Sequence, residues 1–102
     1  MYRAGDERRE QPWLDRLDEA ATALSLEEAA RTRAMDLFLS TAPSSERSKR
    51  AVMATALYVG GLTEGDRRTQ AEVAAVTEVS RLTIQSRWKA LLREAGVTPP
   101  AW

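Results

Sequence analysis

Residues 51–62, AVMATALYVGGL, are apolar around the whole circumference of a helix. Only Thr55 and Tyr58 supply polar side-chain atoms in this run. A helix that is apolar on every side is buried among other elements, because it has no face suited to water. This run limits the possible folds more than any other part of the chain. It predicts a helix at the centre of the domain, with Gly60 and Gly61 ending it.

Two amphipathic helices are predicted before this run and two after it. Pro12 suits the first turn of the first helix, whose apolar stripe begins at Trp13. The second is expected to begin at Ser25, where a capping box pairs the Ser25 hydroxyl with Glu28, and to stop before Pro43. No stretch alternates apolar and polar residues for long enough to favour a strand. The sequence therefore predicts a compact all-α domain of five helices.

Residues 68–89, RTQAEVAAVTEVSRLTIQSRWK, have the residue spacing of a helix-turn-helix. Thr69 and Glu72 form a capping box that opens its first helix, and Ser80 is the expected cap of its second. Small and apolar side chains fall at the positions where such a motif packs its corner against the body. They are Val73, Ala74, Val79 and Ile84.

The last helix is predicted from about Arg81 to Ala95, and Gly96 is expected to end it. Its apolar residues recur on one face and its basic or amide residues on another. The apolar set is Ile84, Trp88, Leu91 and Ala95, and the other set is Arg81, Gln85, Lys89 and Arg93. A helix that buries one face and presents Arg, Gln and Lys on another suits the major groove of DNA. The alternative is an ordinary helical hairpin whose surface happens to be basic.

Fifteen basic and fifteen acidic residues cancel, but they are unevenly distributed along the chain. Residues 1–46 hold six basic and ten acidic groups, net −4, whereas residues 47–102 hold nine basic and five acidic groups, net +4. The basic half contains the helix-turn-helix, as expected of a DNA-binding domain. The absence of Cys and His removes zinc ribbons, thiol nucleophiles and imidazole bases. We therefore expect no metal site, no cofactor and no enzymatic activity.

The length of 102 residues suits a single domain. We expect a flexible segment over residues 1–11, a helical domain over residues 12–97 with the helix-turn-helix at about 69–95, and a tail over residues 98–102. No apolar run reaches the roughly 20 residues that a membrane span needs, and the N-terminus is too polar for a signal peptide. These features predict a cytoplasmic protein with no membrane partner.

The chain resembles a single cyclin-like repeat of the transcription factor B family, eukaryotic TFIIB and archaeal TFB, and most closely the second of that family's two repeats. Residues 48–60, SKRAVMATALYVG, are similar to the family's third helix. Residues 68–89 are similar to its RTQ-x-E opening, its apolar fourth helix, and its turn and recognition helix. The resemblance implies a five-helix cyclin fold whose last two helices contact promoter DNA beside TATA-binding protein.

The resemblance also implies which residues meet DNA. Base contacts of the last helix would fall on Leu82, where the family usually has Val, and on Gln85, where it usually has Arg. The full set of expected DNA-binding residues is Arg68, Thr69, Gln70, Ser80, Arg81, Leu82, Gln85 and Lys89. Glu78 stands where the family has a turn glycine, so the turn either avoids positive φ or accepts a cost of about 1 kcal/mol. Without cysteines or room for a second repeat, we expect the chain to lack the parts by which the family recruits polymerase.

Two functions remain open at this point. The first is a small archaeal, nucleoid-associated transcription regulator that reads promoter DNA with its last helix, alone, as a dimer or beside TATA-binding protein. The alternative is a cyclin-type module that binds a protein partner, TATA-binding protein or another transcription factor, without DNA specificity of its own. A DNA binder should be retained on duplex DNA and released by salt, whereas an interaction module should not bind duplex.

Overall fold

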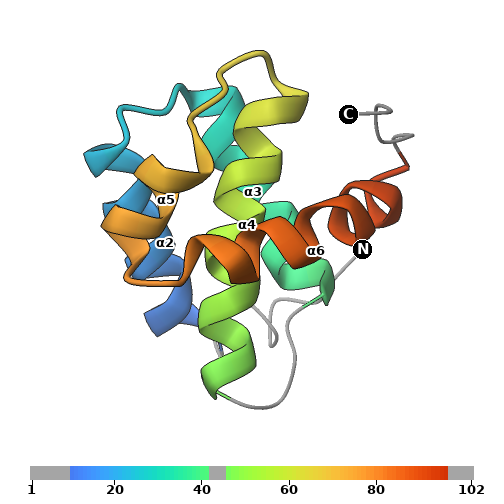
Figure 1. Ribbon diagram of the computed structural model, residues 1–102. Helices are drawn as coiled ribbons and strands as arrows, with labels where there is room; N and C mark the ends of the chain where they lie inside the picture. Colours follow the sequence, from blue (N-terminus) through green and yellow to red (C-terminus); the bar gives the residue numbers. More distant parts are fainter. Residues whose placement is uncertain (1–9, 42–45, 97–102) are drawn as a thin grey trace.

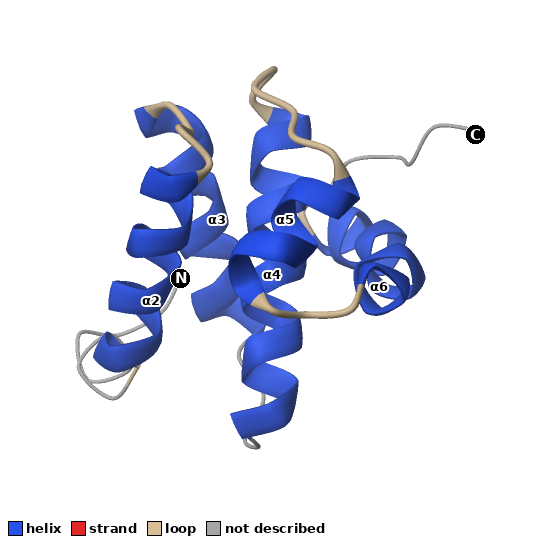
Figure 2. Cartoon of the chain, turned by 60° about the vertical axis from the view of Figure 1, so that its left-hand side comes forward, coloured by secondary structure: helices blue, strands red, loops and turns tan. Residues whose placement is uncertain are grey.

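The computed structural model describes residues 10–41 and 46–96, which contain five helices and no strand. In chain order the helices are α2 (Gln11–Ala23), α3 (Glu28–Thr41), α4 (Glu46–Thr63), α5 (Gln70–Thr77) and α6 (Arg81–Glu94). Helix α4 runs through the middle of the other four and contacts each of them (Figures 1 and 2). The predicted all-α architecture is therefore confirmed. The predicted tail and most of the predicted N-terminal segment lie outside the described residues.

The central position of α4 follows from its apolar sequence. All but one of the residues from Ala51 to Gly61 are buried, and the side chain of Leu57 is only 1% exposed. Even the polar Thr55 is accommodated there, because its hydroxyl donates to the backbone carbonyl of Ala51 at 2.7 Å. A hydroxyl satisfied within its own helix can be buried without leaving an unpaired donor. The predicted central, buried helix is confirmed.

The predicted end of α4 was wrong, because Gly60 and Gly61 lie inside the helix and it continues to Thr63. A Cβ atom on Gly60 would lie 2.7 Å from the backbone oxygen of Ala30 and 3.0 Å from the backbone nitrogen of Ala34. Glycine in a helix interior costs about 1 kcal/mol relative to alanine. Here it lets the backbones of α3 and α4 approach more closely than any side chain would allow.

The predicted start of α3 was also wrong. Ser25 has a left-handed φ of 57°, and it ends α2 instead of opening α3. The Ser25 N–H donates to the carbonyl of Thr22 at 3.0 Å, and the Leu26 N–H donates to that of Ala21 at 2.9 Å. This pair of bonds is the Schellman pattern that closes a helix. Helix α3 begins three residues later, at Glu28.

Candidate nucleic-acid interface

Helices α5 and α6 are joined by a three-residue turn, Glu78 to Ser80, where the helix-turn-helix was predicted. Both predicted caps are present: the Thr69 hydroxyl accepts from the Glu72 N–H at 3.0 Å, and the Ser80 hydroxyl accepts from the Leu82 N–H at 3.1 Å. Glu78 has φ 59° and ψ 28°. The turn therefore keeps the left-handed conformation without the family's glycine and bears its cost.

Helix α6 buries the apolar face that the sequence predicted. Ile84, Trp88 and Leu91 are buried in the core. The Trp88 ring meets the ring of Tyr58 from α4 edge to face, with 5.8 Å between the ring centroids. This contact ties the orientation of α6 to the central helix, because aromatic pairs favour edge-to-face geometry over a face-to-face sandwich.

The neighbouring face of α6 is open to solvent. Arg81 and Gln85 are exposed, and Leu82 is 72% exposed, an unusual value for a leucine. Lys89 is half-buried, with its ammonium 5.7 Å from the centroid of the Trp88 ring. The apolar stem of a lysine can lie along a ring in this way while its charge stays in water.

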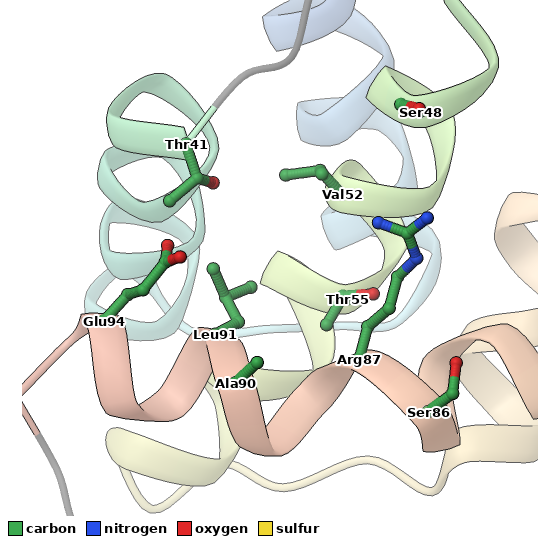
Figure 3. Close-up of a pocket in the computed structure, with 9 residues that line it drawn as sticks. All are labelled: Thr41, Ser48, Val52, Thr55, Ser86, Arg87, Ala90, Leu91 and Glu94. Carbon is green, nitrogen blue, oxygen red and sulfur yellow. The ribbon is translucent and has the colours of Figure 1, made fainter.

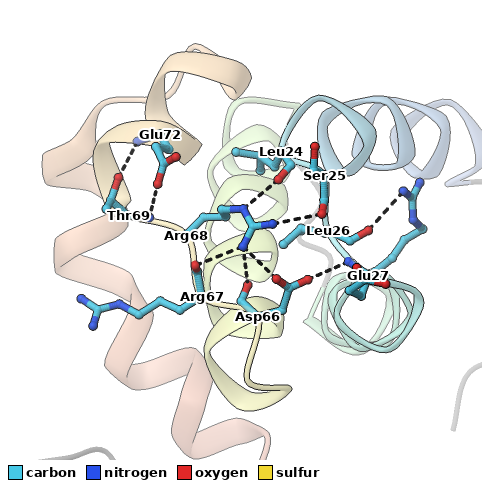
Figure 4. A network of polar contacts seen from close by, with 10 residues as sticks. Leu24, Ser25, Leu26, Glu27, Asp66, Arg67, Arg68, Thr69 and Glu72 are labelled. Atoms are coloured by element: carbon cyan, nitrogen blue, oxygen red, sulfur yellow. Dashed lines mark hydrogen bonds and ion pairs between the residues drawn. The ribbon is translucent and has the colours of Figure 1, made fainter.

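Four of the predicted residues line one shallow pocket of about 300 Å³ between the start of α5 and the start of α6. The lining residues are Tyr58, Arg67, Thr69, Gln70, Ala71, Arg81 and Gln85. Arg67 was not among the predicted site residues. Its side chain extends away from Arg68 towards α6 (Figure 4). Arg67, and not Arg68, lines this pocket, and only the path of the loop separates the two adjacent arginines.

The Arg68 side chain makes several hydrogen bonds within the fold. Its Nε donates to the carbonyl of Leu24 at 2.7 Å and its Nη2 to that of Ser25 at 3.0 Å (Figure 4). Its Nη1 donates to the Asp66 carboxylate at 2.8 Å. The guanidinium therefore binds the turn between α2 and α3. These bonds give Arg68 a role within the fold that the sequence did not predict.

Asp66, which pairs with Arg68, is a further residue that the sequence did not single out. Its Oδ2 accepts from the Glu27 N–H, just before the first turn of α3, at 2.7 Å. That hydrogen bond, followed by the one from Arg68, holds the pKa of the Asp66 carboxyl below its usual value. The pKa of Glu72 is also lowered, first by the Thr69 backbone N–H. Both carboxylates are charged at neutral pH, because the hydrogen bonds that they accept favour the charged form.

A second pocket, of about 320 Å³, lies on another flank of α6 (Figure 3). Thr41 from α3, Val52 and Thr55 from α4, and Arg87 and Glu94 from α6 are among its lining residues. None of the predicted DNA-binding residues lines it. Within residues 10–41 and 46–96, no cluster of acidic side chains is arranged to hold a metal ion. The helices of that same part of the chain are all too short or too polar to cross a membrane.

The chain is similar to known transcription factors. A family model described as the transcription factor TFIIB repeat matches residues 14–94. Transcription initiation factor IIB of Pyrococcus abyssi is 35% identical over 89 residues, which cover 84% of this chain and 30% of that protein. The protein of the same name from Pyrococcus horikoshii matches to the same extent. That of Archaeoglobus fulgidus is 44% identical over 54 residues, 53% of this chain and 17% of that relative.

The chain spans about a third or less of the length of these relatives. The family match, in contrast, covers α3, α4, α5 and α6 completely and all of α2 after its first three residues. The resemblance inferred from residues 48–60 and 68–89 is confirmed. This chain belongs to the family of transcription factor TFIIB repeats.

Proposed function

We propose that this chain is a DNA-binding transcription regulator that reads promoter DNA with α6. The observation that carries the proposal is the exposed face of α6, which presents Arg81, Leu82 and Gln85. Arg81 and Gln85 share a pocket with the capped start of α5. A core-packed helix with forked and amide donors on its outer face fits the major groove. The relatives are transcription initiation factors by name, which supports a role in transcription.

The side chains of this face would divide between phosphates and bases. Arg81 and Lys89 supply positive charge for phosphates, which fixes position without carrying sequence information. The Ser80 hydroxyl accepts from the Leu82 N–H, so its proton remains for a phosphate oxygen. Thr69 and Gln70 border the same pocket and would meet the backbone of the same groove. Leu82 and Gln85 are left to read bases, through a thymine methyl and an adenine edge.

By analogy with the relatives, we infer that the target is promoter double-stranded DNA. TATA-binding protein or another part of the basal machinery would be the protein partner, and the compartment would be the archaeal cytoplasm at the nucleoid. Target choice would then depend on both the α6 contacts and the partner. A cyclin-type module that binds only protein is the rival class, and it predicts no selection among duplexes.

Exchange of one side chain tests the proposed readout. Gln pairs with N6 and N7 of adenine, whereas Arg forks onto O6 and N7 of guanine. Gln85→Arg should therefore move the preference at one base pair from A towards G, with a discrimination of about 1–3 kcal/mol. Selection from a random duplex library, carried out with both proteins, measures this shift.

The matched control is Gln11→Arg, which adds the same charge on α2 at an exposed position. It should leave the selected sequence unchanged. Enrichment of no duplex by the wild-type chain would reject the DNA-binding proposal and favour the protein-binding class. Selection of one sequence by wild type and Gln85→Arg alike would mean that α6 does not read bases through this residue.

A further inference from the structure

Helix α5 is held weakly by its own packing. It has eight residues, and only Val73 and Thr77 among them are buried. Helices this short are marginal by themselves, so their orientation depends on packing and on what holds their ends. The turn from Glu78 to Ser80 joins the C-terminal end of α5 to α6. Arg68 directly precedes the cap residue at the other end.

The Arg68 guanidinium binds that end to the body of the domain. Two of its nitrogens donate to the carbonyls of Leu24 and Ser25, at the C-terminal end of α2. The carbonyl of Leu24, the C-cap residue of α2, has no partner within the helix and lies at the negative end of its dipole, and the Ser25 carbonyl follows it directly. A guanidinium is therefore well matched to them in charge and in geometry.

Asp66 extends the connection to a third helix. One carboxylate oxygen accepts from Arg68, and the other accepts from the Glu27 N–H at the start of α3. Arg68 and Asp66 thus link the end of α2 and the start of α3 to the loop that leads into the Thr69 cap of α5 (Figure 4). Arg68 and Asp66 are both largely shielded from solvent, with side chains 24% and 17% exposed. Charge-assisted bonds in such surroundings are shorter and stronger than neutral ones.

We propose that Arg68 is a positioning residue for the helix-turn-helix: its fork holds the start of α5 on the α2–α3 turn and thereby sets the angle at which α5 and α6 meet DNA. The inference rests on the proposed DNA-binding function. A positioning role and a phosphate contact require different properties of the side chain. A phosphate contact needs the positive charge, whereas positioning needs the planar fork.

Arg68→Lys separates these two requirements. Lysine keeps the charge but has a single nitrogen, so it cannot bind both carbonyls and the carboxylate with the geometry of the fork. If Arg68 positions α5, Arg68→Lys and Arg68→Ala should each weaken duplex binding by about tenfold, because binding must then restore the orientation of α5 at a cost of about one charge-assisted hydrogen bond. Both should keep the wild-type dependence of affinity on salt.

Two comparison variants calibrate this result. Arg81→Gln removes a proposed phosphate contact, so the slope of log affinity against log salt should fall by about 0.9. Arg33→Ala breaks the ion pair between Arg33 of α3 and Glu64. Glu64 also belongs to the loop between α4 and α5, but this ion pair does not involve the α2–α3 turn. Affinity should stay at the wild-type value in that variant. All affinities are measured at a temperature where melting curves show every variant folded.

Hydrogen exchange tests the positioning without DNA. In Arg68→Lys and Arg68→Ala the amides of α5 and of Glu27 should exchange faster than in wild type, while those of α4 should not. Unchanged exchange in α5 would overturn the proposal even if the chain binds DNA. Failure of the wild-type chain to bind duplex would instead reject the proposed function, and the exchange result would still decide whether Arg68 holds α5.

The DNA measurements can overturn the proposal independently. A near wild-type affinity for Arg68→Lys, together with a reduced salt slope for Arg68→Ala, would show that Arg68 contacts phosphate. Unchanged affinity in both variants, with only a lower melting temperature, would show that Arg68 stabilises the fold and does not position the DNA-binding helices.

Discussion

Gly60→Ala should lower the free energy of unfolding by about 1–3 kcal/mol, although alanine is the better helix former by about 1 kcal/mol. The added Cβ would lie 2.7 Å from the Ala30 oxygen and 3.0 Å from the Ala34 nitrogen. Both are backbone atoms of α3, so the whole helix must shift to relieve the clash. Because α3 and α4 share the core, such a shift disturbs packing on both. Urea unfolding followed by circular dichroism measures the change.

Ala34→Gly added to this variant is the informative control. The Ala34 Cβ lies 3.1 Å from the place that the new methyl would take, farther than the two backbone atoms. Its removal should therefore not restore stability. Full recovery would mean that the clash is between side chains alone. A Gly60→Ala protein as stable as wild type would contradict the close approach of α3 and α4.

Leu57→Ala should cost about 2–5 kcal/mol, because the leucine is 1% exposed in the middle of α4 and its loss leaves a cavity in the core. A domain of this size is stable by roughly 5–15 kcal/mol, so this variant should be close to unfolding at ambient temperature. The midpoint of urea unfolding should fall strongly while its slope stays constant.

The same substitution at Leu82 provides the control, because that leucine is 72% exposed. Leu82→Ala should change the free energy of unfolding by no more than about 0.5 kcal/mol. Similar losses at Leu57 and Leu82 would mean that α4 is not the centre of the core, and the cyclin-like architecture would be in doubt.

The parts of the fold that were predictable depend on local pattern. The apolar circumference of residues 51–62 requires burial whatever surrounds it. The capping box of Thr69 and Glu72, and the Ser80 cap, involve residues two or three positions apart, so their chemistry is complete in the sequence. The apolar face of α6 is likewise a matter of helical period.

The parts that were missed depend on contacts between distant segments. Glycine near the end of an apolar run is typical of a helix terminus, and only the approach of α3 reveals that Gly60 is a packing position. Ser25 and Glu28 have the residue types of a capping box, but Ser25 instead takes part in the Schellman hydrogen bonds that end α2. Asp66 accepts a hydrogen bond from the backbone amide of Glu27, 39 positions away in the sequence, and no local pattern indicates such a contact.

The candidate site also contains residues whose placement follows from local pattern and residues whose placement depends on distant contacts. The helical period of α6 predicts that Gln85 and Arg81 face outward, and both are exposed. The role of Arg68 depends on carbonyls 43 and 44 residues earlier, so its basic side chain alone could not distinguish a phosphate contact from a bond within the fold. Arg67 and Arg68 have the same chemistry, and the path of the loop alone separates them.

The most direct test of the central claim is an NMR titration of the ¹⁵N-labelled wild-type chain with a short duplex at low salt. We expect the amide shift changes to concentrate at the start of α5, over Thr69 and Gln70, and along α6 from Ser80 to Lys89. They should fade as salt is raised, because phosphate contacts release counterions. Changes centred instead on the pocket around Thr55 and Glu94, or no changes at all, would contradict DNA recognition by α6.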